Sequence, residues 1–166
     1  MDDVTFAHAM IRELEIETRA TKKCIERFKM ELFDFKPHER SMEMGYLTLL
    51  CAEIPLWIAF IVNDPEIDLA TFEHLHPKST GEIVRHFTNN VEKAKKALES
   101  VTNDALSAQF DLKASGKVVF TDTKRVNIET TINHMVHHRG QLTVYMRLND
   151  IPVPSIYGPS ADEKGF

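Results

Sequence analysis

Apolar residues recur at helical spacing along most of this chain, and the pattern predicts helices. In residues 6–33, Met10, Leu14, Ile25 and Phe28 follow one face, with Glu and Lys between them, which predicts a first helix. From about residue 42 to 62 nearly every position is apolar. A helix that is apolar all round is typical of the centre of a protein, so this second helix is expected to be buried.

Turn-forming residues separate these two helices from the rest. The run Ser79-Thr80-Gly81-Glu82 is a helix start, which predicts a third helix to about Glu99 and a second helical piece over 101–112. A turn at 115–117 and a short extended segment at 117–120 come next. Thr121-Asp122 is then expected to cap a fourth helix that runs to about residue 148.

Four main helices with short connections predict an all-α fold, a four-helix bundle formed by a single domain over residues 1–166. The tail, residues 151–166, holds three prolines and cannot be helix or central strand. Its apolar residues indicate an extended segment that lies over the bundle or over a partner subunit.

Composition narrows the function classes. The net charge is −5 with no basic stripe, which argues against nucleic-acid binding. Cys24 and Cys51 are isolated, as free thiols in a reducing cytoplasm would be, and the acidic N-terminus does not resemble a signal peptide. The segment 44–62 is long enough to cross a bilayer. Glu53, Pro55 and the lack of flanking Lys/Arg clusters favour a core helix over a membrane span.

The most informative motif is His134-Met-Val-His-His138-Arg-Gly-Gln141, within the fourth helix. His134 and His138 are four residues apart, so their rings stack on one face and can bind one transition-metal ion. On a helical wheel both lie in or at the edge of the apolar arc, whereas His137 lies outside it. Two interpretations stay open: a pair of metal ligands, or core-edge histidines satisfied by hydrogen bonds.

The HHRGQ core and the tail Tyr157-Gly-Pro-Ser-Ala-Asp-Glu163 resemble the signature of the DinB-like superfamily. The resemblance extends over nearly the whole chain and includes Ala52-Glu53-Ile54-Pro55. It implies an antiparallel four-helix bundle with unusual connectivity, often a homodimer. In members with a metal, commonly nickel or zinc, three histidines bind it. Two of them match His134 and His138, but Leu50 occupies the place of the third.

Glu53 is the candidate replacement for that third ligand. It follows Leu50 by three residues, and one carboxylate with two histidines suits several metals. The alternative is a buried carboxylate paired with Arg19 or Arg139, since an unpaired buried charge is unfavourable. Three further expectations are that Glu17 pairs with Arg19, that Gly140 allows another helix to approach, and that the scattered histidines face solvent: His8, His74, His76 and His86.

Two functions compete on these observations. The first is a metal-dependent enzyme, which the resemblance suggests is a thiol S-transferase in stress response or detoxification that uses a low-molecular-weight thiol; metal-dependent hydrolysis is the other chemistry such a site allows. The second is a non-catalytic bundle with a degenerate metal site, which binds a small molecule or a partner. The retained histidine pair favours the first, and Leu50 favours the second.

Overall fold

Helix α2 (Met44–Asn63) forms the centre of the computed structural model, which describes residues 3–165. The outermost residues of the predicted domain, 1–2 and 166, lie outside this range. By length and composition α2 could cross a membrane, but 72% of its apolar window is buried within the protein. It packs against α3 (Thr80–Glu99) and α5 (Lys124–Leu148), and its apolar surface is therefore used on more than one side.

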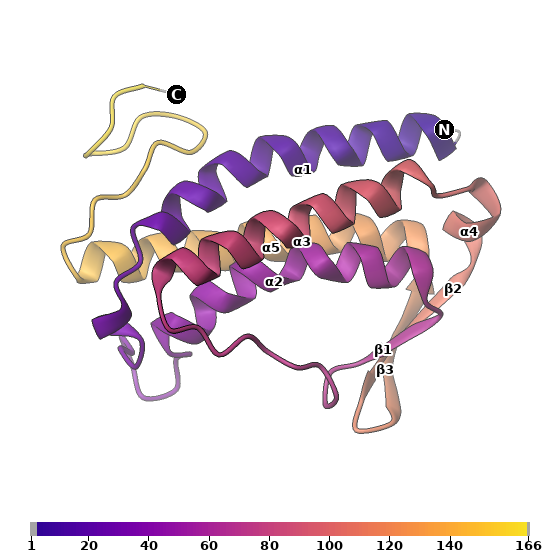
Figure 1. Cartoon of the computed structure of the whole chain (residues 1–166), viewed down its shortest axis with the longest axis horizontal. Helices are drawn as coiled ribbons and strands as arrows, with labels where there is room; N and C mark the ends of the chain where they lie inside the picture. The colour runs from indigo at the N-terminus through magenta and orange to yellow at the C-terminus, as the bar shows by residue number, and fades with distance from the viewer. Residues whose placement is uncertain (1–2, 166) are drawn as a thin grey trace.

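Four long helices lie side by side: α1 (Asp3–Glu26), α2, α3 and α5 (Figure 1). Helices α2 and α3 run in the same direction, because residues 64–79 lead back along the length of the molecule before α3 begins (Figure 1). This pair departs from the antiparallel arrangement that was expected. Ser79 caps α3 as predicted, because it accepts a hydrogen bond from the Glu82 amide. The cap of α5 is Thr123, which accepts from the Val126 amide, and not the predicted Thr121-Asp122.

The first helix is shorter than predicted. It ends at Glu26, and a 3₁₀ turn, η1 (Met30–Leu32), follows. Phe33 then lies directly over Gly45 at the start of α2, where a Cβ atom would overlap the phenyl ring. Glycine is therefore required at position 45 by this close approach rather than by its backbone conformation.

A small sheet lies at one end of the helices and corrects the all-α prediction (Figure 1). The central strand, β2 (Gln109–Ala114), pairs in parallel with β1 (Glu66–Asp68) and antiparallel with β3 (Lys117–Thr123). The predicted helical piece over 101–112 is wrong beyond α4 (Asn103–Ser107). Apolar residues alternate with polar ones after α4, a two-residue period that is typical of a strand. Phe110 lies in β2 on this pattern, and its side chain is buried in the protein core.

Asp68 holds the turn between β2 and β3. Its carboxylate accepts hydrogen bonds from the amides of Ser115 and Gly116 at 3.0 and 2.6 Å. Both residues have positive φ angles, 51° and 77°, which a serine adopts at a conformational cost. These bonds to a distant strand stabilise the turn and link β1 to the hairpin.

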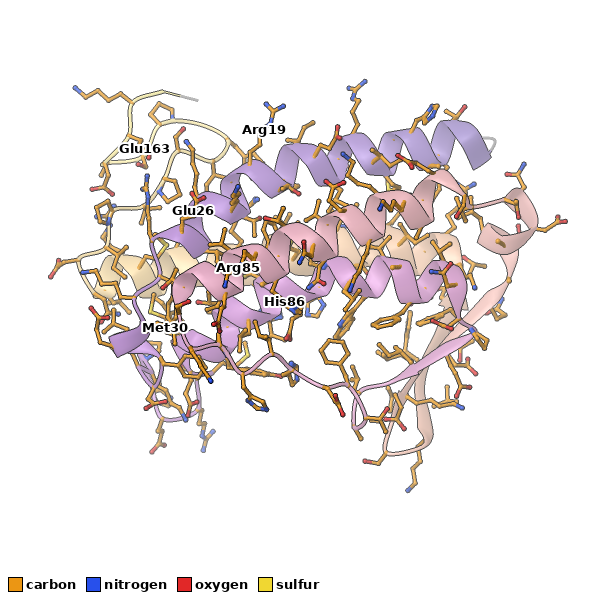
Figure 2. The ribbon with its side chains drawn as sticks, in the orientation of Figure 1. Arg19, Glu26, Met30, Arg85, His86 and Glu163 are labelled. Atoms are coloured by element: carbon orange, nitrogen blue, oxygen red, sulfur yellow. The ribbon has the colours of Figure 1, made fainter. Side chains whose placement is uncertain are left out.

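The tail folds back along the ends of α1 and α5, in line with the prediction of an extended segment that lies over the bundle (Figure 1). Glu163 anchors the tail (Figure 2). Its carboxylate accepts hydrogen bonds from the Ser155 amide at 2.9 Å and from Lys23 at 3.3 Å, and it forms an ion pair with Arg27. The Arg27 guanidinium also donates to the Pro152 carbonyl. The tail is therefore tied to α1 by charge-assisted bonds.

The docking of the tail is expected to weaken in acid. The Ser155 amide, followed by the Arg27 and Lys23 side chains, lowers the pKa of Glu163 from 4.5 to about 2. A carboxylate with a lowered pKa stabilises the folded state above its ordinary pKa and loses that contribution as the pH falls through the folded value. Hydrogen exchange at the Ser155 amide should therefore accelerate as the pH falls from about 4.5 to about 2, after correction for intrinsic exchange. A Glu163→Gln variant should show no such acceleration.

Candidate functional site

The two predicted histidines lie together on the inner side of α5. His138 is buried and His134 is half-buried, whereas His137 is exposed, as the helical wheel predicted. The Nε2 atoms of His134 and His138 are 2.8 Å apart, and the ring centroids are separated by 4.6 Å. The four-residue spacing on a helix produces this stacking without help from another element.

Hydrogen bonding assigns the tautomers of the pair. The His138 Nδ1 atom lies 2.8 Å from Oε1 of Gln141, and a carbonyl oxygen can only accept, so Nδ1 carries the proton. In neutral His138, Nε2 then has a lone pair, and the Nε2–H of His134 donates to it. The remaining nitrogen of His134, Nδ1, is left as an acceptor.

The environment keeps both rings neutral. Burial, followed by the nearby His138 and His137, lowers the pKa of His134 from 6.5 to about 4. Burial also lowers the pKa of His138, while the bond to Gln141 opposes that shift. Near neutral pH the pair is therefore uncharged, and Nδ1 of His134 keeps a lone pair for a hydrogen-bond donor.

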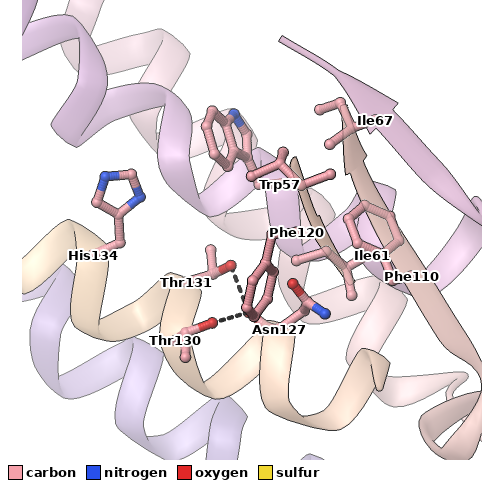
Figure 3. A pocket seen from close by; sticks show the side chains of 10 residues that line it. Trp57, Ile61, Ile67, Phe110, Phe120, Asn127, Thr130, Thr131 and His134 are labelled. Carbon is pink, nitrogen blue, oxygen red and sulfur yellow. Dashed lines mark hydrogen bonds between the residues drawn. The ribbon is translucent and has the colours of Figure 1, made fainter. Parts of the chain in front are cut away.

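A cavity of about 200 Å³ adjoins His134 between α2, α5 and the sheet (Figure 3). Its walls are mainly apolar and aromatic side chains from α2 and all three strands: Trp57, Ile61, Ile67, Phe110, Leu112 and Phe120. Asn127, Thr130 and Thr131 of α5 line the remaining side. The indole of Trp57 contacts the ring of His134, with centroids 5.8 Å apart. The histidine pair thus borders a mostly apolar chamber.

Glu53, the third predicted ligand, is bound elsewhere. Its carboxylate is 1% exposed and lies 2.6 Å from Nδ1 of His74, while the Leu75 amide donates to it at 2.8 Å. His86, in the first half of α3, approaches it to 3.7 Å (Figure 2). The carboxylate is buried and paired, but with histidines rather than with Arg19 or Arg139, and neither His74 nor His86 is a freely solvated side chain.

The residues present do not complete the three-ligand metal site that the resemblance implies. The 2.8 Å between the two Nε2 atoms is close to the ~3 Å that separates two neighbouring nitrogen ligands about 2.0–2.1 Å from one metal ion. However, Leu50 is an apolar, buried side chain. Within residues 3–165 no group of three His, Cys, Asp or Glu side chains is arranged to hold a metal. The fit is limited to two imidazoles.

The sequence prediction missed a buried cluster next to the pair. Arg139, which is 1% exposed, forms an ion pair with Glu17 at 2.5 Å and donates to the hydroxyl of Tyr157 at 2.8 Å. Glu17 therefore pairs across the bundle and not with Arg19. The predicted close approach at Gly140 is also absent, since nothing in residues 3–165 lies within 4 Å of a Cβ built there.

The protein is mainly helical, with a small sheet at one end of its long helices and an inward pair of histidines on the last helix. The sequence model of the DinB family matches residues 1–164, and the chain belongs to that family. The uncharacterised protein YrdA of Bacillus subtilis is 56% identical over 32 residues, a match that spans 19% of either chain. The chain thus matches only about a fifth of that relative's length.

Two solved structures share the fold. The DinB-like protein YjoA from Bacillus subtilis superposes with a TM-score of 0.67 at 17% identity, covering 95% of this chain and 99% of that one. A DinB-like protein from Bacillus cereus gives a TM-score of 0.67 at 22% identity, with 90% and 97% of the two chains covered. These similarities support the arrangement of the helices. At such low identity they give no information about the chemistry of the site.

Proposed function

We propose that this DinB-family protein is a non-catalytic binder of a small apolar molecule that carries a hydroxyl group. The observation that carries the proposal is the apolar cavity of about 200 Å³ with His134 at its border. For comparison, an apolar cavity of about 150 Å³ accommodates benzene. The cavity thus suits a ligand of roughly that size, and its mainly apolar walls favour transfer of such a ligand from water.

One polar atom beside the cavity favours a hydroxyl group on that ligand. Nδ1 of His134 is an acceptor once Nε2 has donated to His138. A hydroxyl group is a donor, so it can satisfy this nitrogen.

Benzyl alcohol tests this proposal, because Trp57 is the single tryptophan of the chain and therefore reports on the cavity by its fluorescence. We expect a saturable change in Trp57 emission on titration. Leu112→Phe, which fills the cavity, should abolish the change. His134→Ala should weaken binding by about fivefold, as expected for the loss of one hydrogen bond worth about 1 kcal/mol.

The matched control is His137→Ala, which removes an exposed imidazole one turn away from the cavity wall. This variant should bind benzyl alcohol as the unmodified protein does. Unchanged emission at all ligand concentrations, together with no uptake in equilibrium dialysis, would contradict the proposal.

The histidine geometry favours a second candidate, a metal-dependent enzyme. His134 and His138 would hold a nickel or zinc ion, which when bound would lower the pKa of a thiol or water. Gln141 supports this candidate because it orients His138 with Nε2 unprotonated, as outer hydrogen bonds do in metal sites. The activity proposed is thiol S-transfer with a low-molecular-weight thiol in stress or detoxification. Its test is the metal affinity of a Leu50→His variant.

A homodimer is the assembly we propose. The outward face of α5 leaves Val144 and Leu148 more than half exposed, at 58% and 57%, and Gly140 lies on the same face with open space around it. Apolar side chains at such spacing suit a helix from a second copy. A cytoplasmic location, with neither nucleic acid nor membrane as a partner, remains the proposal from charge and cysteine usage.

A further inference from the structure

Glu53 is an unusual residue for its position, because it is the only charged side chain of α2 and is 1% exposed. The same protein contains a second buried carboxylate, Glu17, which is paired with the permanently charged Arg139. Glu53 is paired instead with His74, which is charged only when protonated. A histidine compensates a buried carboxylate less fully than a permanently charged arginine, so this pairing points to a use other than stability.

The carboxylate fixes the orientation and the tautomer of His74. The 2.6 Å contact to Glu53 places the proton on Nδ1, because a carboxylate oxygen accepts and a ring nitrogen must donate. In the neutral ring, Nε2 on the other side then has a lone pair, and the hydrogen bonds of His74 within residues 3–165 are made by Nδ1 alone. Aromatic rings hold the imidazole on two sides, with Tyr46 at 5.4 Å and Phe72 at 5.0 Å between centroids.

His74 borders a groove of about 720 Å³ that is distinct from the cavity at His134. The groove lies between η1, the start of α2 and the segment before α3, and its apolar walls are Met30, Phe33, Leu49, Leu75 and Pro77. Charges at its rim are of both signs, with Asp34 and Glu43 against Lys78, and Glu43 is already paired with Lys36 at 3.1 Å. This balance favours a neutral ligand over an anion.

We propose that this groove is a second binding site, for a neutral aromatic compound whose hydroxyl group donates a hydrogen bond to Nε2 of His74. The apolar walls would take the ring system, and the ring of Tyr46 offers an aromatic contact beside the imidazole. Glu53 acts as a positioning residue that holds the acceptor nitrogen toward the ligand.

A pair of matched compounds tests the site. 2-Naphthol has the hydroxyl group, and 2-methoxynaphthalene has the same rings without the donor. Titrations followed by amide NMR should show perturbations around Tyr46, Leu49 and Leu75, with 2-naphthol binding about fivefold to tenfold more tightly, as one hydrogen bond predicts. His74→Phe should retain the aromatic contacts and remove that preference. His137→Phe, which replaces an exposed imidazole of α5 outside the groove, is the control and should retain it.

Because His74→Phe leaves Glu53 without one partner, the double variant Glu53→Gln/His74→Phe removes the charge together with its partner. It should fold and should bind the two compounds equally. Equal binding by the unmodified protein, or a preference that survives in either His74 variant, would overturn the proposal. A preference lost in His134→Ala but kept in His74→Phe would also overturn it, because the hydroxyl would then be bound in the other cavity.

Discussion

Replacement of Arg139 by methionine is expected to lower the free energy of unfolding by about 3–5 kcal/mol, because it leaves a buried carboxylate unpaired. Arg139 donates to Glu17 and, at 3.3 Å, to the hydroxyl of Thr21, and its other nitrogen holds Tyr157 of the tail. Methionine conserves much of the volume but none of the donors. In a chain of this size the loss corresponds to a fall in melting temperature of about 10 °C.

A double variant separates the lost pair from lost packing. In Glu17→Leu/Arg139→Met neither charge remains, so most of the stability should return, and urea unfolding of the four proteins in the cycle gives the interaction energy. The Tyr157 hydroxyl bonds to both partners, at 2.8 and 2.9 Å, so the tail should exchange faster in both variants. Equal destabilisation of the single and double variants would show that the packing of Arg139 matters and its charge does not.

The helices of this protein could be predicted because their signals are local. The apolar run of α2 and the periodic face of α5 indicated buried helices, and the wheel correctly placed His134 and His138 inward and His137 outward. Helix caps at Ser79 and near Thr123 added start points within a few residues. Such signals depend on residues three or four positions apart, and this spacing can be read from a single sequence.

The sheet and the partners of the buried charges depend on distant residues. Strand β2 pairs with β1, which lies more than forty positions earlier in the chain, and only the brief alternation around Phe110 distinguished it from helix. Glu53 meets His74 across 21 positions, and Arg139 meets Glu17 across 122. His86 was predictable, since it is three residues after buried Ile83 and four before buried Asn90. His74, in an irregular segment, had no such signal.

Leu50→His is expected to raise the affinity for nickel or zinc by about 10²-fold or more. Structural zinc sites with four protein ligands release roughly 10–16 kcal/mol, so each ligand contributes about 3 kcal/mol, which corresponds to about two orders of magnitude. Position 50 lies on α2, which packs against α5, the helix that supplies the two neutral imidazoles. Isothermal titration with a metal-free preparation measures the change directly.

Leu50→Asn is the matched control, because it introduces a polar side chain at the same buried position without an imidazole. A gain confined to Leu50→His, and lost again when His134→Ala is added, would mean that the pocket geometry survives and that Leu50 is what weakens the natural site. Tight metal binding by the unmodified protein would instead favour the metal-dependent enzyme. If neither protein binds metal, the spacing of His134 and His138 reflects their mutual hydrogen bond, and the cavity beside them is the more informative site.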